Sequence, residues 1–289
     1  MSTGDSVDVL RPTVIVETPA GRIVVADSLT FFEEGDWRTD AVLGASFAGV
    51  VTGVLPLRQG ARGWLAHEAG PGLDRAGVGG LPLAESMGVP AAAIATMTAR
   101  LGDGRSLLGG QVAAANEVAR SLGVVVGDSG LNAARKMLHA REGAFRECDG
   151  FINDDQHEIV TDFGRAIAVW STSRIQGSHP DDVFCVASHG GKTMAFYALP
   201  MEPRAVICND AGRGLDDSGI AGLALLDDAP VPGATVGTDS ARIGDPLSTY
   251  YDGVISHDNI HAHECGVRVG MRCTEAVDVL LQNAPGDEP

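Results

Sequence analysis

Four polar side chains in the second half of the chain have the types that acyl-transfer chemistry uses. Ser188 and His189 end the apolar run VFCVASH, and Asp210 comes directly after the run AVICN. His257 lies further on, in the segment SHDN. A serine can act as a nucleophile or position a water, a histidine can serve as general base, and a carboxylate can orient that base. The pattern predicts Ser188 as nucleophile, His189 or His257 as base and Asp210 as the orienting group.

Glycines and cations accompany these side chains. The backbone N–H groups of Gly190 and Gly191 are candidate oxyanion donors, because a glycine pair lets the backbone approach a ligand closely. Lys192 or Arg242 would hold a substrate carboxylate. The remaining candidate binding residues are Asn209 and Ser240.

A purely structural explanation stays open for each of these motifs. Ser188 would then cap a helix, and the motif AGxGLD would be a turn that the fold requires. In the motif SARIGD, Arg242 would lock its own loop through Asp245.

Two better-known site types receive less support. The segment GKT invites comparison with a phosphate-binding loop, but that motif demands glycine at position 186, where the chain has Val186. His257 and His261 are four residues apart, as in metal sites on a helix, but His263 lies off that face. We therefore predict neither a metal nor a cofactor.

Composition and charge narrow the class of protein. The 289 residues are 44% hydrophobic and 20% charged, as in a folded globular chain. A net charge of −17 argues against nucleic acid and anionic membranes as partners. The 5 cysteines contain no Cys-x-x-Cys pair, and the N-terminus MSTGDSVDVLRP has no secretory pattern, so a cytoplasmic location is expected.

One uncharged run, residues 41–57, has the GxxxG spacing of membrane helix pairs. The corresponding run in the second half contains His189 and Lys192, which a bilayer core would penalise. A membrane span is therefore not predicted.

The elements that must position these residues repeat along the chain. Residues 40–104 align with residues 182–246 without a gap, most densely where HEAGPGLDRAGVGGL matches NDAGRGLDDSGIAGL. TARLGD then matches SARIGD, and Asn116 falls on Asn259 as an expected structural hydrogen-bonding residue. Such self-similarity predicts two tandem units, residues 1–145 and 146–289, that meet in the polar stretch REGAFRECDGFINDDQHE and pack about a pseudo-twofold axis.

Within each unit, short apolar runs alternate with longer amphipathic stretches. This alternation predicts an α/β fold with mainly parallel sheets and right-handed crossovers. In the second unit the predicted strands are 166–170, 183–188, 205–208 and 233–237. The predicted helices are 191–199, 217–227, 250–264 and 274–281, the last with Thr274 as N-cap.

The two halves differ at the positions that matter for chemistry. The second half has His189, Lys192, Asp210 and His257 where the first has Phe47, Val50, Glu68 and Ala114. We interpret this as a site kept in the second unit, with the first unit serving as scaffold; neutral drift is the alternative.

The combined pattern predicts a cofactor-free hydrolase acting on an amide, lactam or ester bond of a small anionic molecule. Three other functions stay open. They are a lyase or isomerase using the same His and Asp groups, a phosphate- or nucleotide-binding protein using the glycine-rich turn and Lys192, and a purely structural or assembly role. A homo-oligomer is also expected from the apolar, glycine-rich first unit.

Overall fold

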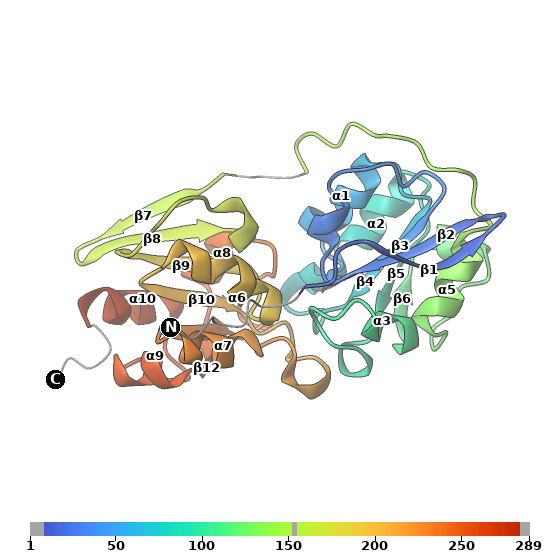
Figure 1. Ribbon diagram of the computed structural model, residues 1–289. Helices are drawn as coiled ribbons and strands as arrows, with labels where there is room; N and C mark the ends of the chain where they lie inside the picture. The colour runs from blue at the N-terminus through green and yellow to red at the C-terminus, as the bar shows by residue number, and fades with distance from the viewer. Residues whose placement is uncertain (1–8, 152–154, 284–289) are drawn as a thin grey trace, which may run out of the picture.

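The computed structural model describes residues 9–151 and 155–283 and places them in two similar α/β units (Figure 1). The first contains a sheet in the order β1-β2-β3-β4-β5-β6, and the second a sheet in the order β12-β11-β10-β9-β8-β7. In each sheet the four inner strands are parallel and both edge strands are antiparallel. The prediction of two tandem, mainly parallel α/β units is confirmed.

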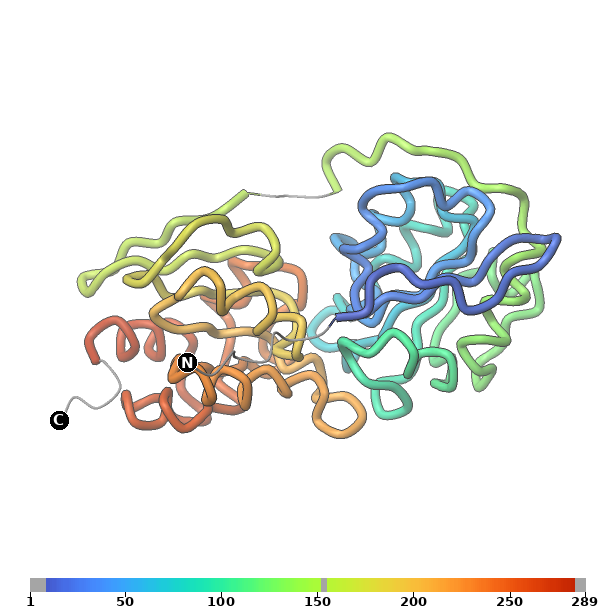
Figure 2. Tube along the Cα trace, in the orientation of Figure 1, coloured from blue at the N-terminus to red at the C-terminus, as the bar shows by residue number. Residues whose placement is uncertain are grey.

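The strands of the first sheet are β1 (Thr13–Thr18), β2 (Gly21–Ala26), β3 (Ala41–Phe47), β4 (Gly63–His67), β5 (Ala91–Ile94) and β6 (Val112–Ala115). Those of the second are β7 (His157–Thr161), β8 (Gly164–Val169), β9 (Asp182–His189), β10 (Ala205–Asn209), β11 (Gly233–Val236) and β12 (Ile255–Asp258). The predicted domain boundary at residue 145 falls between the last helix of the first unit and β7, along the connection that the tube in Figure 2 follows.

The α-helices of the first unit are α1 (Val50–Arg58), α2 (Gly80–Ser86), α3 (Ser106–Gly109), α4 (Glu117–Ser121) and α5 (Gly130–Met137). Those of the second are α6 (Lys192–Ala198), α7 (Gly222–Asp228), α8 (Pro246–Tyr251), α9 (Ile260–Glu264) and α10 (Cys273–Gln282). The short 3-10 helices are η1 (Leu29–Phe32), η2 (Leu73–Val78), η3 (Thr96–Thr98), η4 (Thr172–Arg174), η5 (Leu199–Met201) and η6 (Leu215–Asp217). None of the helices in the described residues is long and apolar enough to cross a membrane.

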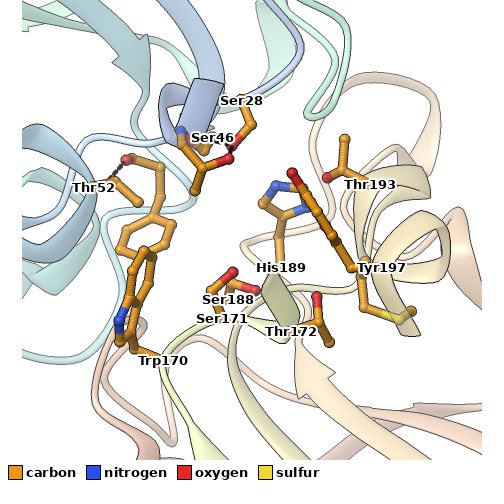
Figure 3. Close-up of a pocket in the computed structure, with 13 residues that line it drawn as sticks. Ser28, Ser46, Thr52, Trp170, Ser171, Thr172, Ser188, His189, Thr193 and Tyr197 are labelled. Atoms are coloured by element: carbon orange, nitrogen blue, oxygen red, sulfur yellow. Dashed lines mark hydrogen bonds between the residues drawn. The ribbon is translucent and has the colours of Figure 1, made fainter. Parts of the chain in front are cut away.

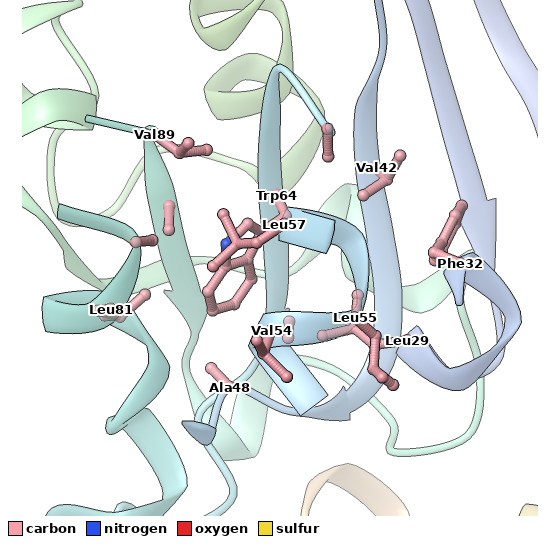
Figure 4. Close-up of a cluster of buried hydrophobic side chains, with 14 of the residues drawn as sticks. Leu29, Phe32, Val42, Ala48, Val54, Leu55, Leu57, Trp64, Leu81 and Val89 are labelled. Carbon is pink, nitrogen blue, oxygen red and sulfur yellow. The ribbon is translucent and has the colours of Figure 1, made fainter. Parts of the chain in front are cut away.

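Each sheet is buried between two layers of helices, as parallel sheets require. In the first unit, Leu55 and Leu57 of α1 and Leu81 of α2 pack with Trp64 on one face of the sheet (Figure 4). Residues of α3, α4 and α5 cover the opposite face. The second unit repeats this arrangement with two further clusters. Both faces of the central strands therefore carry apolar side chains, and β3 is buried along its whole length.

The predicted helix over 250–264 is wrong. The strand β12 separates α8 from α9 and pairs antiparallel with β11, so that β12 forms one edge of the second sheet. Asn259 marks the return to helix, because its Oδ1 accepts the N–H of Ala262 at 2.9 Å and that of Gly233 at 2.8 Å. Asn116 makes the equivalent bonds in the first unit, which confirms the structural role expected of this pair.

Two other helix boundaries also differ from the prediction. Helix α7 begins at Gly222 rather than at residue 217, because Asp216 and Asp217 adopt left-handed backbone angles with φ of 54° and 56°. Helix α10 begins at Cys273 with Arg272 as its N-cap, so the N-cap role predicted for Thr274 is wrong.

The two units meet around matched turns that follow β4 and β10. Gly70 and Gly212 have φ of 72° and 66°, and a Cβ added to Gly70 would lie 2.9 Å from Gly212 Cα. Only glycine permits this approach together with that backbone. The motif AGxGLD is thus retained in both halves because it forms the contact at the pseudo-twofold axis.

Residues 1–8 lie outside the described residues, and they include most of the N-terminal segment in which no secretory pattern was found. Residues 152–154 of the predicted junction also lie outside the described residues.

Candidate functional site

A small cavity lies on the seam between the two units and contains both Ser188 and His189 (Figure 3). Its volume of about 20 Å³ is room for one water molecule or one small functional group. Nine hydroxyl groups and one imidazole line it, and the described lining residues include no carboxylate and no cation. We call it the inner cavity; its lining is Ser28, Thr30, Ser46, Phe47, Thr52, Trp170, Ser171, Thr172, Ser188, His189, Thr193, Met194 and Tyr197.

A bulge at the end of β9 brings Ser188 and His189 to this cavity. Along β10 the register advances from Ile207 to Asn209, while along β9 it advances from Cys185 to His189. The extra residues break the strict alternation of a strand, so that two consecutive side chains face the same space. The equivalent strand β3 contains a bulge before Phe47, so this feature belongs to both units.

His189 is held as a neutral imidazole. Its side chain is buried with 4% exposure, and its Nδ1 accepts the N–H of Gly191 at 3.2 Å. Burial, with a smaller contribution from the nearby His67, lowers the pKa of His189 to about 4. Because Nδ1 is an acceptor, the single proton of the neutral ring is on Nε2. His189 therefore offers an N–H donor to the inner cavity and is not set up as the base that the sequence suggested.

The structure separates Ser188 from its counterpart Ser46. Ser46 Oγ accepts the backbone N–H of Leu29 at 3.0 Å, which gives it a structural task. Ser188 Oγ has no hydrogen-bond partner among the described residues, and the side chain lines the inner cavity (Figure 3). No hydrogen bond links Ser188 to His189 in the described part of the chain. The serine is thus available to a ligand, but it has no base next to it.

The two glycines that follow have backbone roles. Gly190 N–H donates to Asn209 O at 2.9 Å, and Gly191 N–H donates to His189 Nδ1. Both N–H groups are thus used within the protein and do not form the expected oxyanion hole. The two glycines are needed instead for close packing, because a Cβ on Gly190 would lie 2.9 Å from Thr235 Cγ2 and one on Gly191 would lie 2.8 Å from Ser218 O.

Lys192 and Arg242 form ion pairs that join the two units, and neither lines the inner cavity. Lys192 Nζ lies 2.9 Å from Asp27 Oδ2, a carboxylate with 3% side-chain exposure. Arg242 Nε lies 2.6 Å from Asp74 Oδ2 of the first unit, and not at Asp245 as the loop-locking explanation expected. Arg100 makes the symmetric contact, with its Nε 2.8 Å from Asp216 Oδ2. The retained motif SARIGD is explained by this pair of inter-unit salt bridges.

Three other candidate residues stabilise the loops at the end of the second sheet. Asn209 Oδ1 accepts the N–H of Ala211, and its Nδ2 donates to Ala241 O. Asp210 Oδ1 accepts the N–H groups of Gly212 and Thr238, both at 3.0 Å. Ser240 Oγ donates to Gly237 O at 2.7 Å. None of the three lines the inner cavity.

The first unit repeats the loop contacts of Asn209 with a histidine. His67 occupies the equivalent position, accepts the N–H of Ala69 on Nδ1 at 3.0 Å and places Nε2 3.1 Å from Ala99 O. Burial lowers the pKa of His67 as well, so this ring is also neutral. A neutral imidazole and an amide therefore do the same structural work in the two units.

His257 lies on β12 rather than on a helix, with Nδ1 3.2 Å from Ser256 Oγ and 3.4 Å from Thr235 Oγ1. His261 belongs to the separate helix α9, so the two rings do not share a helical face. His257 is not among the inner cavity's lining residues. The described residues contain no group of three His, Cys, Asp or Glu side chains that could hold a metal ion.

Sequence reasoning missed most of the hydroxyl groups in the inner cavity, because they come from four segments of two units. Ser28 and Ser171 could have been found from the sequence, because the repeat aligns them. In the structure each of them caps a 3-10 helix. Thr193 and Tyr197 carried no such signal.

Comparison with known proteins adds no family to this description. No protein-family model matches the chain, and neither a curated protein nor a solved structure matches it.

Proposed function

We propose that the chain binds the carbonyl group of a small molecule in the inner cavity and hydrolyses an amide, lactam or ester bond at that carbonyl. The observation that carries the proposal is the hydrogen bond from Gly191 N–H to His189 Nδ1, which leaves Nε2–H as the donor of a neutral ring that lines the same cavity as the free hydroxyl of Ser188. Neutral imidazole N–H groups polarise carbonyl oxygens in enzymes whose histidine pKa is strongly lowered. A volume of about 20 Å³ admits such a group and little else.

In this proposal Ser188 Oγ attacks the carbonyl carbon, and the oxygen that becomes negative accepts the hydrogen bond from His189 Nε2. The Ser188 proton passes to the leaving nitrogen or oxygen as its bond to the carbonyl carbon breaks, because the negative charge that develops on that atom makes it a stronger base than His189, whose pKa is about 4. The leaving group departs with that proton. Water then adds to the acyl-serine, and its hydrogen restores the Ser188 hydroxyl as the acid is released.

The other functions suggested by the sequence receive less support from these contacts. Proton abstraction by a lyase or isomerase needs a base, and the described lining residues offer none apart from His189. Phosphate binding by Lys192 competes with its ion pair to the buried Asp27.

A second candidate is ligand binding without turnover, and one observation favours it: Ser188 has no base beside it. Both candidates need His189 Nε2–H, but only the hydrolase needs Ser188. The cytoplasmic location and the homo-oligomer also remain proposals, the first supported by five buried thiols, and the second to be tested by light scattering.

The decisive experiment is turnover of short p-nitrophenyl esters and primary amides by Ser188→Ala, His189→Phe and His189→Gln. We expect Ser188→Ala to abolish turnover and His189→Phe to lower kcat by about 10²–10³, the effect of losing one oxyanion donor. His189→Gln keeps an N–H donor and should retain part of the rate. Ser240→Ala, a serine outside the cavity, serves as the matched control. Full turnover in both Ser188→Ala and His189→Phe contradicts the proposal.

A further inference from the structure

A larger pocket adjoins the inner cavity on the same seam. Its volume is about 330 Å³, and two residues, Thr30 and Tyr197, line both spaces. Its lining also includes Arg11, Phe31 and Arg174. We call it the outer pocket. A molecule larger than a single carbonyl group can be held there while one end reaches the inner cavity.

Tyr197 and Thr30 form the partition between the two spaces. Tyr197 comes from α6 of the second unit and Thr30 from η1 of the first, and the phenol hydroxyl hydrogen-bonds Thr30. Burial nevertheless raises the pKa of Tyr197, so the phenol is neutral. Tyr197 and Thr30 therefore face both spaces, one from each unit.

Arg11 is the cation in the outer pocket that is available to a ligand. Its guanidinium stacks on the Phe31 ring, 4.4 Å from the ring centroid, and it makes no ion pair within the described residues. Stacking covers the face of the guanidinium and leaves its N–H edge open to a carboxylate. By contrast, Arg174 is already paired with Glu33, with Nη1 2.9 Å from Oε1.

The backbone next to Arg11 is fixed to the seam. Leu10 N–H donates to Asp27 Oδ2 at 2.8 Å, and Asp27 N–H donates to Leu10 O at 2.9 Å. The same Asp27 carboxylate pairs with Lys192 of the second unit. Arg11 is therefore positioned by the contact that joins the two units.

We infer that the outer pocket is a recognition subsite in which Arg11 binds a carboxylate of the substrate, while the substrate's carbonyl extends past Tyr197 to His189 and Ser188. This rests on the proposed function and adds to it the substrate class, an amide or ester that carries one carboxylate. The net charge of −17 repels anions in general, so their binding depends on a local guanidinium. Glu34 also lines the outer pocket and disfavours a second negative charge.

The test compares matched probes by calorimetry: malonamate, succinamate and glutaramate, each with a carboxylate and an amide, against the uncharged diamides of the same lengths. We expect wild type to bind one of the three carboxylates about tenfold tighter than its diamide. Arg11→Ala should remove this preference and Arg11→Lys should keep part of it. Arg135→Ala, an exposed arginine of α5 outside both pockets, should behave as wild type.

Equal affinity for carboxylate and diamide, no binding of any probe, or a preference that survives in Arg11→Ala overturns the inference. Arg11-dependent binding without turnover supports the subsite and rejects the hydrolase. Turnover that depends on Ser188 but shows the same KM for charged and uncharged amides in wild type and Arg11→Ala supports the hydrolase and rejects the subsite.

Discussion

Replacing His189 with phenylalanine should make the protein less sensitive to acid. The substitution introduces the residue that the first unit has at the matching place, Phe47, which is fully buried at the end of β3. Burial keeps His189 unprotonated in the native state at pH values where the unfolded chain would bind a proton. The pKa of the ring is near 6.5 in the unfolded chain and about 4 in the native state.

The sign and size follow from proton linkage. Because the native pKa is the lower one, the stability contributed by the neutral ring is fully present above pH 6.5 and is lost as the pH falls toward 4. Between pH 7 and pH 5 this single group should lower the free energy of unfolding by about 2 kcal/mol. His67 acts in the same direction in wild type and in His189→Phe, so the difference between the two proteins isolates His189.

The assay is urea denaturation at pH 7, 6 and 5, with the free energy of unfolding taken at each pH. His189→Phe should lose about 2 kcal/mol less than wild type over this interval. His139→Gln, at an exposed histidine, should lose as much as wild type. If His189→Phe and wild type lose stability in parallel, His189 is not a buried neutral ring and the case for its Nε2–H donor fails.

Three further predictions compare the effects on stability of side chains whose polar groups have partners within the protein with those of side chains that have none. Ser46→Ala should lower the free energy of unfolding by about 1 kcal/mol by removing the acceptor of a buried N–H, whereas Ser188→Ala should leave it unchanged; equal effects in urea melts contradict this. His67→Asn should be tolerated and His67→Ala should cost about 2 kcal/mol or more, because only the amide replaces both hydrogen bonds; if both unfold at the same urea concentration, the equivalence is wrong. Lys192→Met should cost about 1–2 kcal/mol by leaving the Asp27 carboxylate buried without its cation, and an unchanged urea midpoint would count against that ion pair.

Local patterns in the sequence were sufficient for the fold class. The constant offset between residues 40–104 and 182–246 predicts a duplication, and short Val- and Ile-rich runs predict buried parallel strands, because both signals are carried by neighbouring residues. The strand β12 escaped prediction because its sequence, ISHD, has no apolar alternation. That segment is a strand only because the edge of β11 offers it hydrogen-bonding partners.

The candidate site was only partly predictable. Ser188 and His189 lie at the carboxyl end of β9, where α/β sheets bind ligands, and both were predicted from the sequence. Lys192 and Arg242 were nominated on the same grounds, but their partners Asp27 and Asp74 are in the other unit. Which charges remain free to bind a ligand therefore depends on how the two units dock.

The sequence by itself determined the repeat, the alternation of strands and helices, and the two residues at the centre of the candidate site. Only the tertiary structure decided the chemistry of those residues. The tautomer of His189 depends on one backbone N–H and on burial at a seam between units, and the inner cavity exists only where hydroxyl groups of both units meet. Hydrogen bonding and desolvation depend on which groups are neighbours in space. Residue types and their spacing along the chain therefore do not reveal these effects until the fold is known.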